Sequence, residues 1–283
     1  MTRITVLPSL PARPADGHKG LFGRVLVIGG NDTMLGAPVL AGTAALKMGS
    51  GLVQIALPKA VLAAALSVTP ELIGLAREAA IKPILEAAAM ADVVIIGPGL
   101  GQSAAAKKLL MVVLKQDHET VVDADGLNIL AMGKSWPKAI GGKAVLTPHP
   151  GEMKRLAKLL GKSSVPSDDD GRLAMAVQAA QSFKQIVVLK GGRTVVTDGK
   201  QAYVNRTGDS SLSKAGTGDV LSGVIGSLIG QKMERLSAAV AGVWIHGRAG
   251  EIAGKKFGMR SVLARDVIDA LPAAIAEYEK VAG

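Results

Sequence analysis

A glycine-rich turn with a single acid, within residues 214–223 (KAGTGDVLSG), carries the clearest chemistry in the sequence. Apolar residues recur at helical spacing from Val220 onward, so Gly216–Gly218 stands at a helix N-terminus. Free backbone N–H groups and the helix dipole favour an anion such as phosphate there. Asp219 would repel that phosphate unless it accepts a proton from a group attacking it. In isolation, a structural glycine turn explains the motif equally well.

A histidine and a glutamate follow another apolar run, in the stretch TPHPGE. His149 lies between Pro148 and Pro150, which fix the local backbone and aim its ring. Binding a ligand and a structural role are equally good readings of this histidine. Glu152 could help to hold a hydrated Mg²⁺ against phosphate oxygens. Alternatively, as an acid in the first turn of a helix, it could interact favourably with the helix dipole.

The stretch KGGRT, residues 190–194, places a lysine and two glycines directly after the apolar run IVVL. A cation beside an exposed backbone suits nucleotide phosphates, although a basic hairpin turn would have the same composition. The residues concerned are Lys190, Gly191, Gly192, Arg193 and Thr194.

Three other motifs carry less weight. The stretch Gly161–Ser163 resembles part of a phosphate-binding loop, but Leu156 occupies the place of its first glycine. Gly99–Ala104 (GLGQSA) has the spacing of a dinucleotide-binding turn, with Asp123 about 20 residues further on. A dehydrogenase is therefore an alternative. His246 lies inside an apolar helical run, so we expect a hydrogen-bonded core histidine.

Composition bounds the fold and excludes several classes of site. The 283 residues suffice for one large α/β domain, which we predict to span the whole chain, 1–283. Hydrophobic residues make up 48% and aromatic residues only 2%, so aliphatic side chains must build the core. The absence of cysteine excludes disulfides, thiolate metal sites and a cysteine nucleophile. It also fits a reducing compartment, and we expect a cytoplasmic protein.

The net charge of +10 predicts a surface that attracts anions. Lysines and arginines are scattered and aromatic residues are few, so nucleic acid is not the expected partner and small phosphorylated ligands fit better. Charges and glycines interrupt every long apolar stretch, which argues against a membrane span. Residues 1–20 lack a continuous apolar run, so no signal peptide is expected.

Strands and helices are predicted to alternate along the chain. The Pro-rich residues 1–20 should wrap the surface, and residues 58–91 should be mostly helical. The Gly223 and Gly226 side of the helix after the acidic turn is thin enough to pack closely against a neighbour. Strands are expected at 24–29, 52–57, 92–97, 120–123, 143–147 and 186–190, with a hairpin of 194–197 and 202–205; helices are expected at 36–48, 103–115, 127–132, 152–160, 171–183, 217–230, 234–253 and 263–280.

The predicted strands lack charges at their centres, which is typical of a parallel sheet covered on both faces. Ligands bind such sheets at the carboxyl ends of the strands. The loops that follow these strands should therefore converge on one edge and face the turn at 216–219. These loops are 29–36, 97–101, 123–128, 147–152 and 190–194.

Taken in order, eight stretches of this sequence resemble one family, the ADP/ATP-dependent NAD(P)H-hydrate dehydratases, a branch of the ribokinase-like fold. The resemblance covers nearly the full length and is most specific where TPHPGE occurs together with GPGLG. It implies a three-layer α/β fold with a mostly parallel sheet between helices. The stretches are 18–30, 34–37, 97–101, 123–128, 147–152, 188–192, 216–221 and 246–250.

The resemblance implies a repair reaction on small molecules. The substrate would be the S epimer of NADH or NADPH hydrated at C6 of the nicotinamide ring. Asp219 would deprotonate the C6 hydroxyl for attack on the terminal phosphate of ADP, or of ATP, with Mg²⁺ as the cofactor. Elimination of the phosphate ester would restore NADH or NADPH and leave AMP and phosphate, with backbone N–H groups of the Gly216–Gly218 turn stabilising the transferred phosphoryl group.

Site residues follow by position from the same resemblance. Asp209, Ser211–Lys214 and Glu251 depart from the family pattern and leave the nucleotide preference open. Glu152 would assist Mg²⁺ through water. The expected contacts to the hydrated dinucleotide are Ala37, Gly99, Gly101, His149 and Asp219; those to the adenine nucleotide are Lys190, Gly191, Gly192, Arg193, Thr194, Gly216, Thr217 and Gly218.

Competing functions remain at this stage. A kinase of the same fold would phosphorylate a vitamin-like alcohol with the same base and leave the phosphate on its product. A dehydrogenase would need no ADP, and a nucleotide-binding sensor would have no turnover to lose. The resemblance also suggests a homo-oligomer, with a tetramer as one form, that works beside a separate NAD(P)H-hydrate epimerase.

Overall fold

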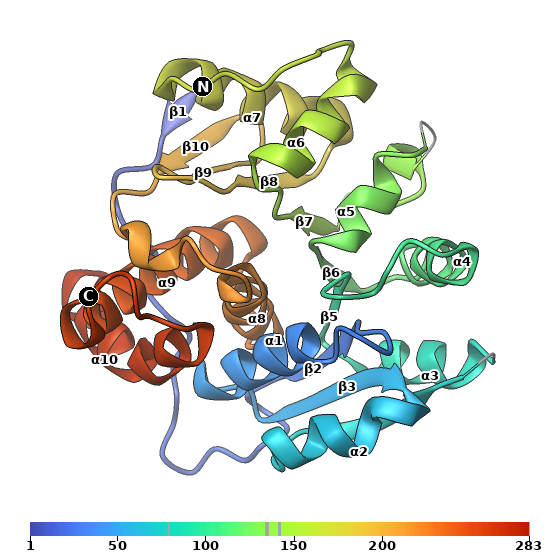
Figure 1. The fold of residues 1–283 in the computed structure, drawn as a ribbon. Helices are drawn as coiled ribbons and strands as arrows, with labels where there is room; N and C mark the ends of the chain where they lie inside the picture. Colours follow the sequence, from blue (N-terminus) through green and yellow to red (C-terminus); the bar gives the residue numbers. More distant parts are fainter. Residues whose placement is uncertain (79, 134–135, 141–142, 283) are drawn as a thin grey trace.

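A single ten-stranded sheet runs through the computed structural model, which describes residues 1–78, 80–133, 136–140 and 143–282 (Figure 1). The strand order is β1-β10-β9-β8-β7-β6-β5-β2-β3-β4. Neighbouring strands are parallel except in the two pairs that involve β9. The mostly parallel sheet confirms the predicted fold class.

Each strand is short and, at the centre of the sheet, fully buried. The hairpin predicted around Asp198 and Gly199 is confirmed as β9 and β10. The strands are β1 (Thr2–Arg3), β2 (Arg24–Ile28), β3 (Leu52–Pro58), β4 (Ile73–Arg77), β5 (Val93–Ile96), β6 (Glu119–Val122), β7 (Ala144–Leu146), β8 (Ile186–Leu189), β9 (Val195–Thr197) and β10 (Gln201–Val204).

Helices cover both faces of the sheet because successive strand residues point to opposite sides. In β2, Val25 and Val27 join the core with α1, α8, α9 and α10, whereas Leu26 and Ile28 join the core with α3 to α7. The helices are α1 (Gly36–Lys47), α2 (Lys59–Val68), α3 (Lys82–Met90), α4 (Ala104–Val113), α5 (Asp125–Leu130), α6 (Pro150–Ala157), α7 (Asp169–Phe183), α8 (Thr217–Gly230), α9 (Arg235–Phe257) and α10 (Ala264–Ala282).

Helix α8 packs closely against α1 through Gly223 and against strand β5 through Gly226. A Cβ added at Gly223 would lie 2.1 Å from the carbonyl oxygen of Ala41, and one at Gly226 would lie 2.5 Å from Ile95 Cδ1. These contacts confirm the thin helix face. They hold the first turn of α8 over the carboxyl ends of the central strands.

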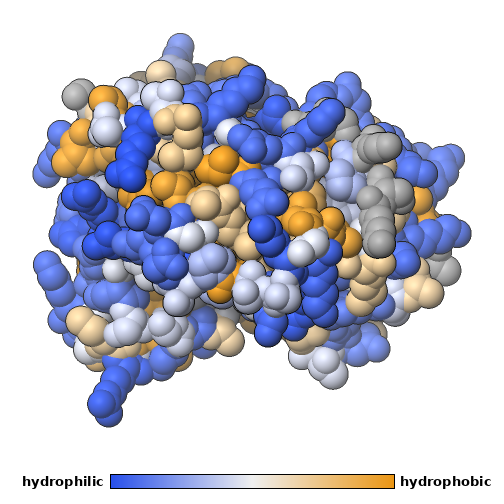
Figure 2. Space-filling view, turned by 90° about the horizontal axis from the view of Figure 1, so that it is seen from above, coloured by the Kyte–Doolittle hydropathy of each residue, from blue (hydrophilic) through white to orange (hydrophobic). Residues whose placement is uncertain are grey.

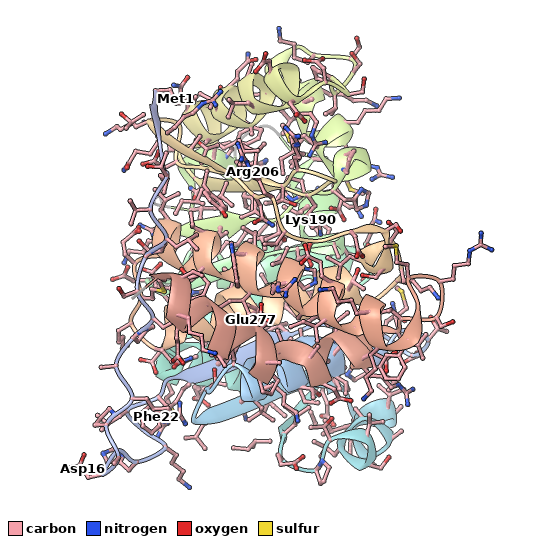
Figure 3. The ribbon with its side chains drawn as sticks, turned by 90° about the vertical axis from the view of Figure 1, so that its left-hand side faces the viewer. Met1, Asp16, Phe22, Lys190, Arg206 and Glu277 are labelled. Carbon is pink, nitrogen blue, oxygen red and sulfur yellow. The ribbon has the colours of Figure 1, made fainter. Side chains whose placement is uncertain are left out.

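Two predictions at the sheet edges were wrong in part. Residues 58–91 include the strand β4, which pairs with β3 between helices α2 and α3. This edge strand is only half-buried and includes Gly74 and Arg77, so it lacks the apolar run of the central strands. At the N-terminus, Thr2 and Arg3 form β1 beside β10, and the Pro-rich residues after them cross the molecular surface toward Asp16 and Phe22 (Figure 3).

The face in Figure 2 is mostly hydrophilic, and apolar side chains gather in separate groups on it. Within the described residues, no helix is long and apolar enough to cross a membrane.

Candidate active site

The loops predicted to converge do so at the carboxyl edge of the sheet. Gly30 N–H donates to Pro98 O at 2.8 Å, which joins the loops after β2 and β5. Further along the same edge, Lys190 N–H donates to Pro148 O at 2.9 Å, which joins the loops after β8 and β7. The edge faces the first turn of α8.

The glycine turn before α8 is held from behind. Gly216 has a φ of +93°, a left-handed conformation that glycine adopts readily. The Thr217 hydroxyl donates within its own loop, to Leu212 O and Lys214 O at 2.8 and 2.9 Å. That hydroxyl orders the turn. The Thr217 N–H also donates to Lys214 O, at 3.4 Å, so Gly216 and Gly218 carry the backbone N–H groups that the turn offers to an anion.

A buried histidine supports the same turn. His246 Nε2 lies 2.8 Å from Thr217 O. A carbonyl can only accept, so Nε2 carries the proton and donates. Burial lowers the pKa of His246 to about 4, and the ring is therefore neutral near neutral pH. This is the hydrogen-bonded core histidine that the sequence predicted, although it also lines the cavity described below.

An ion pair lies at the centre of the edge. Lys190 Nζ contacts Asp123 Oδ1 at 2.8 Å, and Ser222 Oγ donates to Asp123 Oδ2 at 2.6 Å. Asp123 is only 1% exposed. Burial opposes ionisation of both partners, but their mutual attraction lowers the pKa of Asp123 and, together with Glu152, raises that of Lys190. The sequence patterns place Asp123 in a dinucleotide fingerprint and in the family stretch 123–128, without a role beside Lys190, and they give no sign of Ser222.

Asp219 stands next to this pair on the first turn of α8. Burial raises its pKa to about 7; the negative charges of Asp123 and Glu152 add to the rise, and Lys190 opposes it. A carboxylate with a pKa near neutrality can accept a proton from a hydroxyl and remain partly ionised at working pH. The geometry therefore suits the predicted general base.

His149 and Glu152 form a capping box at the start of α6. His149 Nδ1 accepts from Gly151 N–H at 2.9 Å, and Glu152 Oε2 accepts from His149 N–H at 2.7 Å. The capping role of the glutamate, one of its two readings, is thus present. Burial raises the pKa of Glu152 to about 7, with Lys190 opposing. The His149 side chain remains 52% exposed and can still meet a ligand.

A protein-only metal site is not formed by the described residues. No group of three or more His, Cys, Asp or Glu side chains there could hold a metal ion. Glu152 is 4% exposed and lies 3.9 Å from Lys190 Nζ. This donor set fits an Mg²⁺ carried by nucleotide phosphates and water, with Glu152 reaching it through water.

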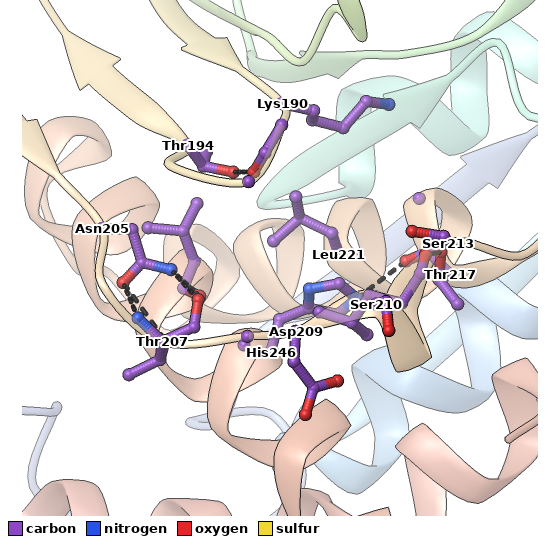
Figure 4. Close-up of a pocket in the computed structure, with 17 residues that line it drawn as sticks. Lys190, Thr194, Asn205, Thr207, Asp209, Ser210, Ser213, Thr217, Leu221 and His246 are labelled. Atoms are coloured by element: carbon purple, nitrogen blue, oxygen red, sulfur yellow. Dashed lines mark hydrogen bonds between the residues drawn. The ribbon is translucent and has the colours of Figure 1, made fainter. Parts of the chain in front are cut away.

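A cavity of about 440 Å³ opens beside the glycine turn (Figure 4). It lies between the loop carrying Lys190 and Thr194 and the segment from Asn205 to Ser213. Six predicted nucleotide contacts line it: Lys190, Gly191, Gly192, Thr194, Thr217 and Gly218. A Cβ added at Gly218 would lie 3.3 Å from Lys190 Nζ, so the two loops nearly touch.

Other lining residues were missed from the sequence. They come mainly from the segment after β10 and from α9, which the sequence marked only through Asp209, Ser211–Lys214 and the family stretch 246–250, without assigning contacts there. They are Asn205, Thr207, Gly208, Asp209, Ser210, Leu212, Ser213, Leu221, Val243, His246 and Gly247.

Arg193 does not line this cavity. Its guanidinium pairs with Asp169 at 2.7 Å and is 60% exposed. A different arginine supports the loop from behind: Arg172 of α7 donates to Leu189 O, Lys190 O and Arg193 O at 3.2 to 3.5 Å. Arg172 lies near the N-terminal end of α7, outside any recognisable motif, so its sequence context gave no sign of this role.

Three of the five residues predicted to bind the dinucleotide, Ala37, Gly99 and Gly101, lie after β2 and β5, whereas His149 caps α6 and Asp219 lies on α8. A Cβ added at Gly99 would lie 3.4 Å from Ala37 Cβ, so these two positions are adjacent. Gly101 N–H, however, donates to Asp125 Oδ2 at 2.8 Å. A dinucleotide fingerprint needs the N–H groups of this turn for a pyrophosphate, so the hydrogen bond weighs against the dehydrogenase alternative.

Strand order arranges these groups in a row along the edge. Ala37 and Gly99 lie at the β2 and β5 end, Asp123 follows β6, and the cavity begins beyond β8. Asp219 faces the middle of the row, beside Asp123 and Lys190. One ligand on each side would bring its reactive group to the same carboxylate.

Comparison with known proteins agrees with this geometry. The family model described as NAD(P)H-hydrate dehydratase matches residues 25–273. The chain is 34% identical to the ADP-dependent (S)-NAD(P)H-hydrate dehydratase of Listeria monocytogenes, over 93% of this chain and 91% of that protein. This chain belongs to the NAD(P)H-hydrate dehydratase family.

A solved structure of the family supports the membership. The ADP/ATP-dependent NAD(P)H-hydrate dehydratase of Bacillus subtilis, co-crystallised with ATP and Mg²⁺, superimposes with a TM-score of 0.82 and 29% identity, covering 98% of this chain and 100% of that one. A hydroxyethylthiazole kinase from Pyrococcus horikoshii, at 16% identity and a TM-score of 0.65, shares the fold alone.

Longer relatives carry an additional part. The chain is 41% identical to a bifunctional NAD(P)H-hydrate repair enzyme of Moorella thermoacetica, over 96% of this chain. It spans only 52% of that relative's length. The chain therefore matches about half of this bifunctional relative.

Proposed function

We propose that this protein dehydrates the S epimer of hydrated NADH or NADPH, with ADP or ATP as phosphoryl donor. The observation that carries the proposal is the position of Asp219. This residue stands on the first turn of α8, close enough to Asp123, Lys190 and Glu152 for their charges to shift its pKa, and its neighbour Gly218 lines the cavity. A base so placed can link a hydroxyl on one ligand to a phosphate on the other. Family membership supplies the identity of both ligands.

In the first step, Asp219 takes the proton of the C6 hydroxyl as the oxygen attacks the terminal phosphorus of the nucleotide. The bond from that phosphorus to its bridging oxygen breaks, and with ADP as donor AMP departs. Lys190 and the N–H groups of the Gly216–Gly218 turn stabilise the charge on the transferred group. A general base contributes about 10²- to 10⁴-fold to such a step.

In the second step, the phosphate ester leaves C6 with its bonding electrons. The lone pair of the ring nitrogen assists, and a proton leaves C5, so the C5–C6 double bond returns. The products are NADH or NADPH, AMP and inorganic phosphate. Phosphorylation converts hydroxide, a poor leaving group, into phosphate.

Nucleotide binding is proposed at the cavity beside α8, with Lys190, Gly191, Gly192, Thr194 and Gly218 as the principal contacts. The side chain of Arg193 points to Asp169, so its contribution would come from its backbone. Mg²⁺, when bound with the nucleotide, would neutralise phosphate charge, and Glu152 would orient its water shell. His149 and Gly101 are proposed to flank the dinucleotide.

The cellular setting follows from the proposed chemistry. We propose a single domain over residues 1–283, a cytoplasmic location and a homo-oligomeric state such as a tetramer. The bifunctional relatives suggest a partner reaction, epimerisation of the R hydrate, performed by a separate epimerase. Size-exclusion chromatography with light scattering tests the oligomeric state.

Product analysis tests the proposal against a kinase. The protein is incubated with hydrated NADH, ADP and Mg²⁺, and phosphorus NMR follows each phosphate. The proposal predicts AMP and free phosphate in equal amounts to the NADH formed. AMP accompanied by a stable phosphorylated product would indicate a kinase instead. Absence of turnover of the hydrated dinucleotide with both ADP and ATP would contradict the dehydratase and leave the kinase to be tested with a panel of small alcohols.

A further inference from the structure

The segment from Asn205 to Ser213 forms one wall of the cavity and rests on the glycine face of α9 (Figure 4). A Cβ added at Gly247 would lie 2.3 Å from Thr207 Oγ1, and one at Gly250 would lie 2.6 Å from Leu212 Cγ. The wall therefore depends on α9 for its position.

Four hydrogen bonds attach this wall to α9. At its start, Asn205 Nδ2 donates to Val243 O at 3.1 Å, and Thr207 Oγ1 donates to Trp244 O at 2.9 Å. Gly208 N–H donates to Glu251 Oε1 at 2.7 Å, and Ser211 Oγ donates to Gly250 O at 2.9 Å. Of the four acceptors on α9, three are backbone carbonyls and only the glutamate is a charged side chain. Hydrogen bonds to charged groups are the stronger ones. Gly208 itself lines the cavity and has a φ of +97°.

The same glutamate is held from the other side by α10. Arg248 Nη1 lies 2.5 Å from Glu251 Oε2. The Nε and Nη2 groups of Arg248 bond the two carboxylate oxygens of Glu277 at 2.5 and 3.2 Å. Glu277 lies on the outer helix layer in Figure 3. One carboxylate oxygen of Glu251 thus faces the cavity wall and the other faces a fixed arginine.

We infer that Glu251 is a positioning residue for the nucleotide: clamped by Arg248, it holds Gly208 and the wall that the nucleotide contacts. Glu251 is not itself among the residues that line the cavity. It acts through the backbone of Gly208. The inference deepens the proposed function and rests on it for the identity of the nucleotide.

The Glu251–Gly208 hydrogen bond is remote from Asp219, the proposed base. Glu251 does not appear among the charges that shift the pKa of Asp219, which are those of Asp123, Lys190 and Glu152. Loss of the contact should weaken the nucleotide in the ground state and the transition state alike. The KM for ADP should rise while kcat is kept.

Three variants separate the hydrogen bond from helix packing. Glu251→Ala removes both contacts of the carboxylate. Glu251→Gln keeps an acceptor for Gly208 N–H and loses the charge that pairs with Arg248. Glu277→Gln changes only the α10 partner of Arg248 and leaves both the Arg248–Glu251 and the Glu251–Gly208 contacts in place, so it is the matched control. Calorimetry measures ADP binding, and steady-state kinetics measures KM and kcat.

The inference predicts that Glu251→Ala weakens ADP binding about tenfold, the size expected for one charge-assisted hydrogen bond. Glu251→Gln should recover most of this loss, and Glu277→Gln should bind ADP like the wild type. The KM for the hydrated dinucleotide should not change. Melting temperatures identify variants that have merely unfolded.

Unchanged ADP affinity in Glu251→Ala would overturn the inference and leave the proposed function intact. An equal loss in Glu277→Gln would also overturn it, because helix packing would then be the cause. Tight ADP binding by the wild type without formation of NADH would remove the proposed reaction, and the binding data would still decide the role of Glu251.

Discussion

The carboxyl group of Asp219 shares its surroundings with two other acids and one lysine. Asp123 is ionised in its pair with Lys190, whereas burial raises the pKa values of Glu152 and Asp219 to about 7. Two groups that titrate near neutrality around one permanent ion pair give the site a pH-dependent charge. The rate should depend on the fraction of Asp219 that is ionised.

Replacing Asp123 with Asn should move the rising limb of the pH profile to lower pH. The negative charge of Asp123 raises the pKa of Asp219, so its removal lowers that pKa. It also frees Lys190, which acts in the same direction. The measurement is kcat/KM for the hydrated dinucleotide across the neutral range. A limb that stays in place or moves to higher pH would contradict this account of Asp219.

Asp219→Asn should be more stable than the wild type at mildly alkaline pH. The folded-state pKa of about 7 exceeds the ordinary value of 3.8, so the contribution of this group is full at acid pH and is lost as the pH rises from 3.8 to about 7. Asn cannot ionise and avoids the loss. We expect a melting temperature roughly 2–4 °C higher, the shift given by ~1 kcal/mol in a chain of this size.

The control for this stability prediction is pH itself. The advantage of Asp219→Asn over the wild type should shrink steadily as the pH falls toward 3.8. A gap in melting temperature that is equal at all pH values would point to a packing effect instead.

Elements position the site through close helix contacts and through side chains that reach behind loops. The first turn of α8 is placed by the contact between Gly223 and Ala41 on α1. The loop after β8 is placed by Arg172, which is 8% exposed and donates to three carbonyls. Neither Gly223 nor Arg172 lines the cavity, so each supports it from behind.

Gly223→Ala should destabilise the protein although alanine favours helices by about 1 kcal/mol. Its Cβ would lie 2.1 Å from the carbonyl oxygen of Ala41, so α1 and α8 must separate. We expect a net loss of roughly 1–3 kcal/mol in urea unfolding, as for other overpacked cores. Gly36→Ala is the control, since nothing lies within 4 Å of its added Cβ. Equal stability of the two variants would refute the close contact.

Arg172→Leu should weaken the loop that lines the cavity. The substitution leaves the carbonyls of Leu189 and Lys190 without their donor, which costs roughly 1–3 kcal/mol for a buried group. We expect a lower urea midpoint and weaker ADP binding. Wild-type values for both would show that the arginine does not support the loop.

At the scale of the whole molecule, the central strands were predictable because they are apolar runs bounded by glycine, as in Arg24–Gly29. Their order then placed Asp219, Lys190 and Gly218 together. The half-buried β4 was not predictable, because its exposed positions broke the pattern. The role of Glu251 was not predictable either, because a helix glutamate that bonds Gly208 N–H gives no local motif.

Nucleotide binding should stabilise the whole chain. A ligand present at about 100 times its Kd raises the free energy of unfolding by ~2.7 kcal/mol, which corresponds to roughly 5–10 °C in melting temperature. The cavity between the 190–194 loop and the 205–213 segment connects β8, α8 and α9, so ADP should cross-link them. Thermal melting with ADP, and with adenosine as a phosphate-free control, measures the effect. An equal rise in melting temperature with adenosine would show that the phosphates do not contribute to binding.

The most direct test follows the near-ultraviolet absorbance of reduced nicotinamide after the protein is mixed with hydrated NADH, ADP and Mg²⁺. The account predicts a rise that requires the nucleotide and that falls by at least about 10²-fold in Asp219→Asn, the contribution of a general base. Binding of ADP by that variant should persist. A rise without ADP, or an undiminished rate in Asp219→Asn, would contradict the assignment of Asp219 as the base of a nucleotide-dependent dehydration.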